Sequence, residues 1–158
     1  MKILVTGAGS RIGQAIIKLI NKSKYKSKII AADYFEDSIG FFWSHKNYIL
    51  PDFLKKNISN KDWVRKIEMI ISENNIKLIL PGVDFELKLF AKYKNYLERK
   101  YNLVCAVSNL NIINIFNDKL KTHNFLSKNN IKCSLTYPFI NKSKFFDTIK
   151  KGKFVIKP

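Results

Sequence analysis

Short, nearly continuous apolar runs recur along the chain, and each is followed by a longer segment in which apolar residues are spaced differently. Runs of this kind are typical of strands that are buried on both faces of a parallel sheet. The runs that predict strands are residues 2–5, 29–32, 48–50, 77–80 and 103–107. Pro51 ends the third run, because proline cannot donate a ladder hydrogen bond. Residues 34–45 are aromatic and irregular in pattern, which predicts a loop over the sheet edge.

The segments between these runs repeat their apolar residues every three or four positions, which predicts helices. The repeating sets are Ile12, Ile16, Leu19 and Ile20; Trp63, Ile67, Ile70 and Ile71; Leu87, Phe90, Ala91 and Leu97; and Leu110, Ile113 and Phe116. Ser59 or Asn60 is expected to cap the second helix, and Ser108 or Asn109 the fourth. Strict alternation of strands and helices predicts an α/β fold with a Rossmann-like three-layer parallel sheet over residues 1–116.

The first predicted strand leads into the sequence Thr-Gly-Ala-Gly-Ser-Arg-Ile-Gly at residues 6–13. A glycine loop between a parallel strand and a helix lets backbone approach a ligand, and the helix start favours an anion. Asp33 follows Gly13 by twenty residues, where a dinucleotide site places the carboxylate that binds ribose hydroxyls. Ser10 and Arg11, however, replace glycines of the dinucleotide patterns, so a side chain stands where the pyrophosphate would approach.

The carboxyl ends of parallel strands lie at one edge of a sheet, and ligands bind beyond that edge. Three segments of this chain are predicted to meet there and to form a binding surface. The candidate site residues on them are Gly7, Ala8, Gly9, Ser10, Arg11, Asp33, Asp84 and Glu86. Structural roles are an open alternative for Asp84 as a helix cap and for Glu86 as a first-turn carboxylate. They are equally open for Asp33 as a polar strand end and for Arg11 as a surface residue.

The C-terminal part of the chain has a different character. Asn-Asp-Lys at residues 117–119 predicts a helix start, and residues 129–138 predict an extended connection. Ser143 is expected to cap a further helix that ends at Gly152, and residues 154–158 predict a strand. A strand that stops at Lys-Pro is an unusual end for a packed domain, so we expect this second domain to be incomplete.

The order of these elements resembles the start of the ATP-grasp fold. The motifs that carry the resemblance are Asn-Asp-Lys at 117–119, Phe-Leu-x-x-Asn-x-Ile at 125–131, Thr-Tyr-Pro at 136–138 and Phe-Val-Ile-Lys-Pro at 154–158. The N-terminal part is similar to the pre-ATP-grasp domain of carbamoyl-phosphate-synthase-like proteins, through Ile-Leu-Val-Thr-Gly-Ala-Gly, Ala-Ala-Asp and Leu-Pro-Gly-x-Asp-x-Glu-Leu. The resemblance implies a pre-ATP-grasp domain over residues 1–116 and the first elements of an ATP-grasp α+β domain over residues 117–158.

The resemblance also implies an activity. ATP-grasp ligases use ATP and Mg²⁺ to convert a small-molecule carboxylate into an acyl phosphate, which an amine or another nucleophile then attacks. Lys119 and Lys157 stand where the family places two lysines that contact ATP phosphates, a role that suits a point charge. The glycine loop then becomes a wall of the substrate site. The family continues beyond the final Lys-Pro with a glycine-rich loop and magnesium ligands, so we expect residues 1–158 to be inactive alone.

Composition narrows the classes of partner. The formal charge of +17 would favour a polyanionic partner, but the lysines are spread along a chain rich in Asn and Ile, so nucleic acid is not expected. No run approaches the about 20 apolar residues of a membrane span, so we expect no membrane partner and a cytoplasmic location. Cys105, Cys133, His45 and His123 lack metal-ligand spacing, so no metal site or disulfide is expected. An incomplete domain exposes apolar surface, which favours a homodimer.

Two other classes of protein remain open. The first is an NAD(P)-binding protein of the short-chain dehydrogenase type, to which Thr6-Gly7, Gly13 and Asp33 correspond. Tyr96 and Lys100 supply the Tyr-x-x-x-Lys spacing of that class, but they fall between the fourth and fifth predicted strands, without a catalytic-serine strand before them. The second class is a non-enzymatic Rossmann binding module.

Overall fold

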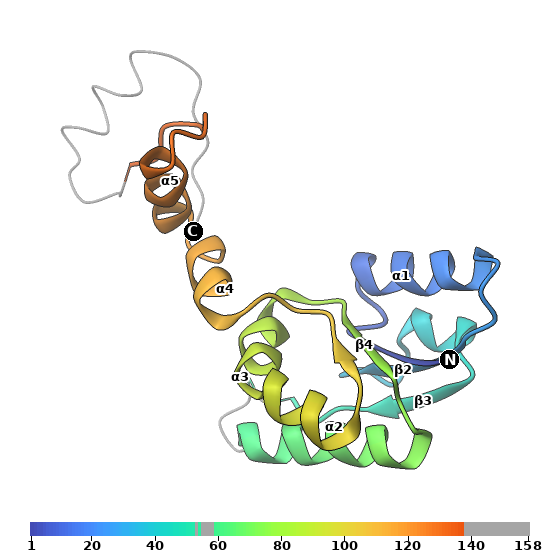
Figure 1. Cartoon of the computed structure of the whole chain (residues 1–158). Coiled ribbons are helices and arrows are strands. Elements are labelled where there is room, and N and C mark those ends of the chain that lie inside the picture. The colour runs from blue at the N-terminus through green and yellow to red at the C-terminus, as the bar shows by residue number, and fades with distance from the viewer. Residues whose placement is uncertain (53, 55–58, 138–158) are drawn as a thin grey trace. The chain divides into compact units, whose positions relative to one another are not determined.

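The computed structural model describes residues 1–52, 54 and 59–137 of the chain, and Figure 1 shows it from end to end. The chain divides into two compact units, Met1–Ile113 and Asn114–Pro158. The first unit contains a five-stranded sheet and the helices that cover it. The described residues of the second unit contain the end of one helix and a whole further helix.

The sheet of the first unit is parallel throughout, with the strand order β3-β2-β1-β4-β5. Its strands are β1 (Lys2–Thr6), β2 (Lys28–Asp33), β3 (Lys46–Ile49), β4 (Leu78–Pro81) and β5 (Val104–Cys105). Strands with apolar side chains on both faces require cover on both faces. The Rossmann-like α/β fold class is confirmed, and a strand lies at each of the five predicted places. The third begins earlier than predicted and is mostly exposed, and the fifth is shorter than predicted.

Successive side chains along the three central strands β1, β2 and β4 enter two separate cores, one on each face of the sheet. On one face, Ile3 and Val5 pack with Ile17 of α1 (Arg11–Lys22), and η1 (Ile39–Trp43) adds partly buried aromatic side chains. On the other face, Leu4 packs with α2 (Asn60–Asn74) and α3 (Asp84–Tyr101) in a larger core. Figure 1 shows α1 on one side of the sheet and both α2 and α3 on the other.

Two details of the first core differ from the sequence prediction. The buried apolar side chain of α1 is Ile17, whereas Ile12 and Leu19 are 54% and 68% exposed. The segment predicted as an irregular loop contains the short helix η1, whose Phe41 and Trp43 pack against this core. Both differences arise because several apolar residues could face inward, and the packing partners decide which of them do.

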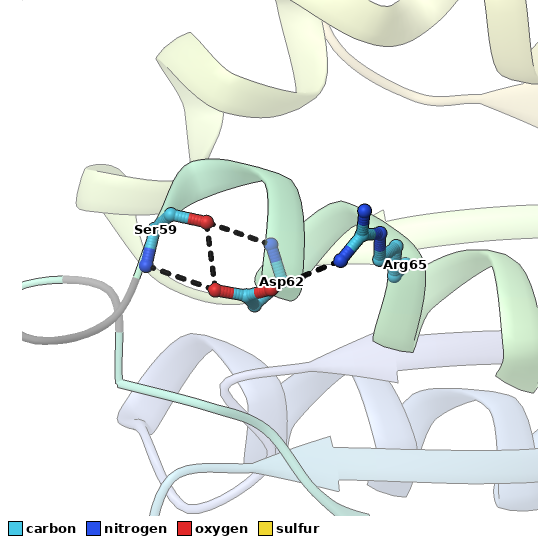
Figure 2. A network of polar contacts seen from close by, with 3 residues as sticks. All are labelled: Ser59, Asp62 and Arg65. Atoms are coloured by element: carbon cyan, nitrogen blue, oxygen red, sulfur yellow. Dashed lines mark hydrogen bonds and ion pairs between the residues drawn. The ribbon is translucent and has the colours of Figure 1, made fainter.

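The start of α2 is held by a reciprocal capping box, drawn in Figure 2. The Ser59 hydroxyl accepts a hydrogen bond from the Asp62 amide (3.2 Å), and the Asp62 carboxylate accepts one from the Ser59 amide (3.2 Å). Arg65 donates to the other carboxylate oxygen of Asp62 at 3.4 Å. Of the two predicted caps, Ser59 is the one that forms, and it sets the helix so that Trp63 and Ile67 face the core.

The second unit begins within α4 (Leu110–Phe116) and continues with α5 (Lys119–Lys128). Asp118 caps α5 by accepting a hydrogen bond from the Lys121 amide at 3.0 Å, so the predicted helix start is confirmed. The rings of Phe116 and Phe125 meet edge to face with centroids 5.8 Å apart. The predicted helix from Ser143 and the strand over 154–158, with Lys157, lie outside the described residues.

In the part of the chain that the structure describes, no helix is both long enough and apolar enough to cross a bilayer.

Candidate functional site

The three segments predicted to converge at the carboxyl edge of the sheet do so. The loop after β1 bonds to the end of β2 through the Gly9 amide, which donates to Asp33 Oδ2 at 2.6 Å. The same loop bonds to the segment after β4 through the Ser10 hydroxyl, which donates to the Gly82 carbonyl at 2.8 Å. Hydrogen bonds therefore join all three segments into one surface at the carboxyl edge, although Ser10 and Gly82 are more than seventy residues apart.

The glycines of the β1–α1 loop allow backbone to pack on backbone. Gly7 has a φ of +57°, a left-handed conformation that side chains rarely adopt. A Cβ added to Gly13 would stand 2.1 Å from the Gly7 carbonyl oxygen. Ser10 caps α1 by accepting a hydrogen bond from the Gly13 amide at 2.9 Å, and Ala8 is fully buried. These residues hold α1 against the sheet.

Asp33 uses both carboxylate oxygens within the protein. Oδ2 accepts hydrogen bonds from the Gly9 amide and from the Ser38 hydroxyl (3.2 Å), and Oδ1 accepts one from the Tyr34 amide (2.6 Å). The side chain is almost completely buried. Asp33 therefore ties the glycine loop to the end of β2.

Glu86 lies at the centre of a buried polar network. Its Oε2 accepts a hydrogen bond from the Thr6 hydroxyl at 2.5 Å, and its Oε1 accepts one from the Tyr34 hydroxyl at 2.7 Å. The Tyr34 oxygen in turn accepts a hydrogen bond from the Trp63 indole at 2.9 Å. The network joins β1, the end of β2, α2 and α3 beneath the carboxyl edge.

Burial dominates the electrostatics of this network. Removal from water raises the pKa of Glu86 to about 7, although its two hydroxyl donors oppose the rise. Burial and the neighbouring carboxylate raise the pKa of Tyr34 well above its usual range. Glu86 was predicted to lie at the edge, but it is fully buried. Its partners Thr6 and Tyr34, and the contact of Trp63 with Tyr34, were not predicted. The only signal for this network in the sequence was the position of Tyr34, directly after Asp33 at the end of β2.

Asp84 and Arg11 are the exposed charged candidates at the edge. Asp84 does not cap α3, because the cap position belongs to Val83 and makes no side-chain hydrogen bond there. Asp84 is instead the first residue of the helix, where the dipole favours a carboxylate. Arg11 is the first residue of α1. Phe85, 40% exposed, packs its ring on Tyr34 with centroids 5.3 Å apart, and so adds an aromatic surface to the same edge.

The candidate ATP-binding lysines belong to the second unit. Lys119 is exposed and is the first residue of α5, and Lys157 lies outside the described residues. Among residues 1–52, 54 and 59–137, no group of three His, Cys, Asp or Glu side chains is arranged to hold a metal ion.

The Tyr-x-x-x-Lys pair lies in a surface network on α3. The Tyr96 hydroxyl and the Lys100 ammonium both donate to Glu68 Oε1, at 2.7 Å and 2.8 Å. At the rise of an α-helix, Tyr96 lies roughly 18 Å along α3 from Asp84. It therefore lies toward the opposite edge of the sheet. This placement weighs against a short-chain dehydrogenase site.

Residues 3–104 match the family model of the PylC-like N-terminal domain. The chain belongs to this family. The family is the pre-ATP-grasp region of ATP-grasp enzymes, so the resemblance drawn from the sequence is confirmed. A comparison with curated proteins finds no match.

Solved structures share the fold. N5-carboxyaminoimidazole synthetase from Staphylococcus aureus, in complex with ADP, is 14% identical at a TM-score of 0.58, over 94% of this chain and 35% of its own. The biotin carboxylase domain of 2-oxoglutarate carboxylase from Hydrogenobacter thermophilus, a dimer with MgADP and bicarbonate, is 14% identical at a TM-score of 0.58, over 97% and 33%. This chain thus spans about a third of the length of either structure.

Proposed function

We propose that this chain is the N-terminal portion of an ATP-dependent ligase that joins a small-molecule carboxylate to an amine or another nucleophile through an acyl phosphate. The observation that carries the proposal is the family match over residues 3–104, on a sheet whose carboxyl edge carries the candidate substrate residues. We place the boundary between its two domains at residue 116.

The first domain would supply the substrate side of the active site. Arg11 is exposed at the edge and suits a substrate carboxylate, because its guanidinium forms paired hydrogen bonds with that group. Asp84 is exposed at the same edge and suits an amine or a hydroxyl. Asp33 and Glu86 would act as positioning residues, since their oxygens hold the β1–α1 loop and Tyr34.

The second domain would supply the nucleotide side. The exposed Lys119 stands at the positive end of the α5 dipole, so both charges favour a phosphate group. The Asp118 carboxylate already accepts a hydrogen bond from the Lys121 amide at this helix start. We therefore assign the phosphate contact to the side chain of Lys119. Lys157 would be the second cation. ATP bound with Mg²⁺ would supply the phosphoryl group, and we propose that the magnesium ligands come from ATP-grasp segments outside residues 1–158.

Residues 1–158 alone are then proposed to have no ligase activity, a cytoplasmic location where ATP is the cosubstrate, and no nucleic-acid partner. Association into a homodimer is part of the same proposal. Calorimetry of residues 1–158 with Mg-ATP and with NAD separates the ligase from the dehydrogenase alternative. Tight NAD binding, or ATP turnover by residues 1–158, would overturn the proposal.

The assignment of Lys119 is tested in a protein that includes both residues 1–158 and the remaining ATP-grasp segments proposed above. Lys119→Ala should weaken Mg-ATP binding about tenfold, because a charge-assisted hydrogen bond to phosphate is lost. Lys128→Ala, at the other end of α5, is the matched control and should leave the affinity unchanged. Equal affinities for the two variants would remove Lys119 from the nucleotide site.

A further inference from the structure

A buried carboxyl group holds parts of the carboxyl edge together. Glu86 lies in the first turn of α3 and is completely buried, and each of its oxygens accepts a hydrogen bond from one hydroxyl. The donors are Thr6 at the end of β1, at 2.5 Å, and Tyr34 directly after β2, at 2.7 Å. The Tyr34 ring also packs on Phe85, the residue before Glu86. These contacts therefore fix the helix turn that carries the exposed residues Asp84 and Phe85.

One proton changes what Glu86 does in this network. An ionised carboxylate only accepts hydrogen bonds, whereas a protonated carboxyl group also donates one. The Thr6 hydroxyl can donate or accept, so its bond to Glu86 can reverse when the carboxyl group is protonated. The Tyr34 oxygen accepts the Trp63 indole N–H at 2.9 Å, and its own hydrogen is directed at Glu86. Both states of Glu86 therefore keep two hydrogen bonds, but only the ionised state brings a charge into a site closed to water.

The surroundings of Glu86 do not offset that charge. Within residues 1–52, 54 and 59–137, no lysine, arginine or histidine forms an ion pair with it. The titratable groups that act on Glu86 are Asp33 and Tyr34 at the end of β2, and the groups from β1 and α2 are the uncharged Thr6 and, through Tyr34, Trp63. Burial and, to a smaller extent, Asp33 raise the pKa of Glu86 to about 7 against its hydroxyl donors. Both states are therefore populated near neutral pH.

We propose that Glu86, Thr6 and Tyr34 form a pH-sensitive latch: the protonated carboxyl group holds the first turn of α3 in place, and loss of the proton loosens this turn together with Asp84 and Phe85. On loss of the proton the O–H bond of Glu86 breaks, its electron pair stays on the oxygen, and the proton passes to water. The carboxylate is then stabilised by water that reaches it when the turn opens. The meaning of the latch for a substrate rests on the proposed function, because this turn lies at the proposed substrate edge, whereas the latch itself does not.

The first test records proton–nitrogen NMR spectra of residues 1–158 between about pH 5.5 and pH 8.5. Trp63 is joined to Glu86 through Tyr34, so its indole N–H resonance should move with a midpoint near pH 7. Glu86→Gln should abolish this midpoint, because the glutamine amide donates to Thr6 and accepts from Tyr34 as the protonated carboxyl group does. Trp43, the other tryptophan of the chain, is the internal control and should respond to pH alike in both proteins.

The second test measures the opening itself by amide hydrogen exchange. In an α-helix the amides of residues 88–90 donate to the carbonyls of residues 84–86, so their protection reports on the first turn of α3. After correction for the intrinsic rate, this protection should fall about tenfold from pH 5.5 to pH 8 in the wild type and stay constant in Glu86→Gln. The amides of β1 give the rate at which the whole unit unfolds, and residues 88–90 should exchange faster than these.

Circular dichroism shows whether Glu86→Gln is folded. Where it is not, Thr6→Val serves, and the Trp63 midpoint should then move upward, because the Thr6 hydroxyl favours the ionised form. Three results would overturn the proposal: a Trp63 resonance without a midpoint between about pH 6 and pH 8, an unchanged midpoint in the folded variant, and protection at residues 88–90 that does not fall with pH. These measurements use no ATP, so the latch and the ligase assignment can fail separately.

Discussion

The first unit and the described part of the second are stabilised in different ways. The first has two apolar cores, one on each face of its sheet, with Leu4, Ile17 and Trp63 among the fully or almost fully buried side chains. In residues 114–137 of the second unit no side chain is buried, and the local contacts include the Asp118 helix cap, a left-handed turn at Asn130 and one aromatic pair. Burial of apolar surface makes the first unit cooperative, whereas local hydrogen bonds stabilise the described part of the second.

Trp63→Ala is expected to have the largest effect on stability, and to affect the first unit far more than the second. Trp63 is 1% exposed, packs edge to face on Phe90 and donates to Tyr34, so its removal should destabilise the first unit by about 3–5 kcal/mol. Urea unfolding measures the loss. Phe116→Ala, in the second unit, is the control and should change the main transition by less than about 1 kcal/mol, because Phe116 is 44% exposed. Similar losses for the two variants would contradict the contrast.

Glu86 should make the stability of the first unit depend on pH. Its folded pKa is raised from 4.5 to about 7, so the favourable contribution is complete below the unfolded pKa and is lost as pH rises through about 7. A shift of this size corresponds to about 3 kcal/mol. Urea unfolding at pH 5 and pH 8 should show that Glu86→Gln removes this part of the dependence. Glu73→Gln, on the surface, should keep it. A Glu86→Gln protein with the wild-type pH dependence would disprove this prediction.

Asp33→Asn tests the link between the glycine loop and β2. Asp33 accepts hydrogen bonds from three donors, and the amide nitrogen of asparagine would face at least one of them without accepting. We therefore expect the free energy of unfolding to fall by about 2 kcal/mol. Asp84→Asn, at an exposed position of the same edge, should stay within about 0.5 kcal/mol. Thermal or urea unfolding of both variants decides the point, and equal stabilities would mean that Asp33 does not hold the loop.

The smallest effect, and the most local, concerns the helix caps. Asp118→Ala and Ser59→Ala each remove a side-chain cap worth about 1 kcal/mol. Ser59→Ala should lower the main urea midpoint, because α2 belongs to a cooperative core. Asp118→Ala should leave that midpoint unchanged and speed amide hydrogen exchange within α5. A shift of the main midpoint by Asp118→Ala would show that the two units unfold together.

The fold was predictable from sequence because its strands are nearly continuous apolar runs and its helices have clear apolar spacing. The meeting of the β1 loop, Asp33 and the β4 loop also followed, since the carboxyl ends of parallel strands share an edge. The orientation of single side chains did not follow. Glu86 is buried and Ile12 is exposed because each depends on contacts with residues distant in sequence, as with Thr6 and Tyr34 around Glu86.

The strand order has a consequence for self-association. The two outer strands, β3 and β5, contain only four and two residues, and β3 begins with a lysine. Unpaired backbone on a long outer strand invites the strand of another molecule, and short, charged outer strands discourage this. Within the described residues the sheet therefore offers little backbone for a neighbouring chain to extend, so a dimer formed by the described part of the first unit should join through its helices or loops.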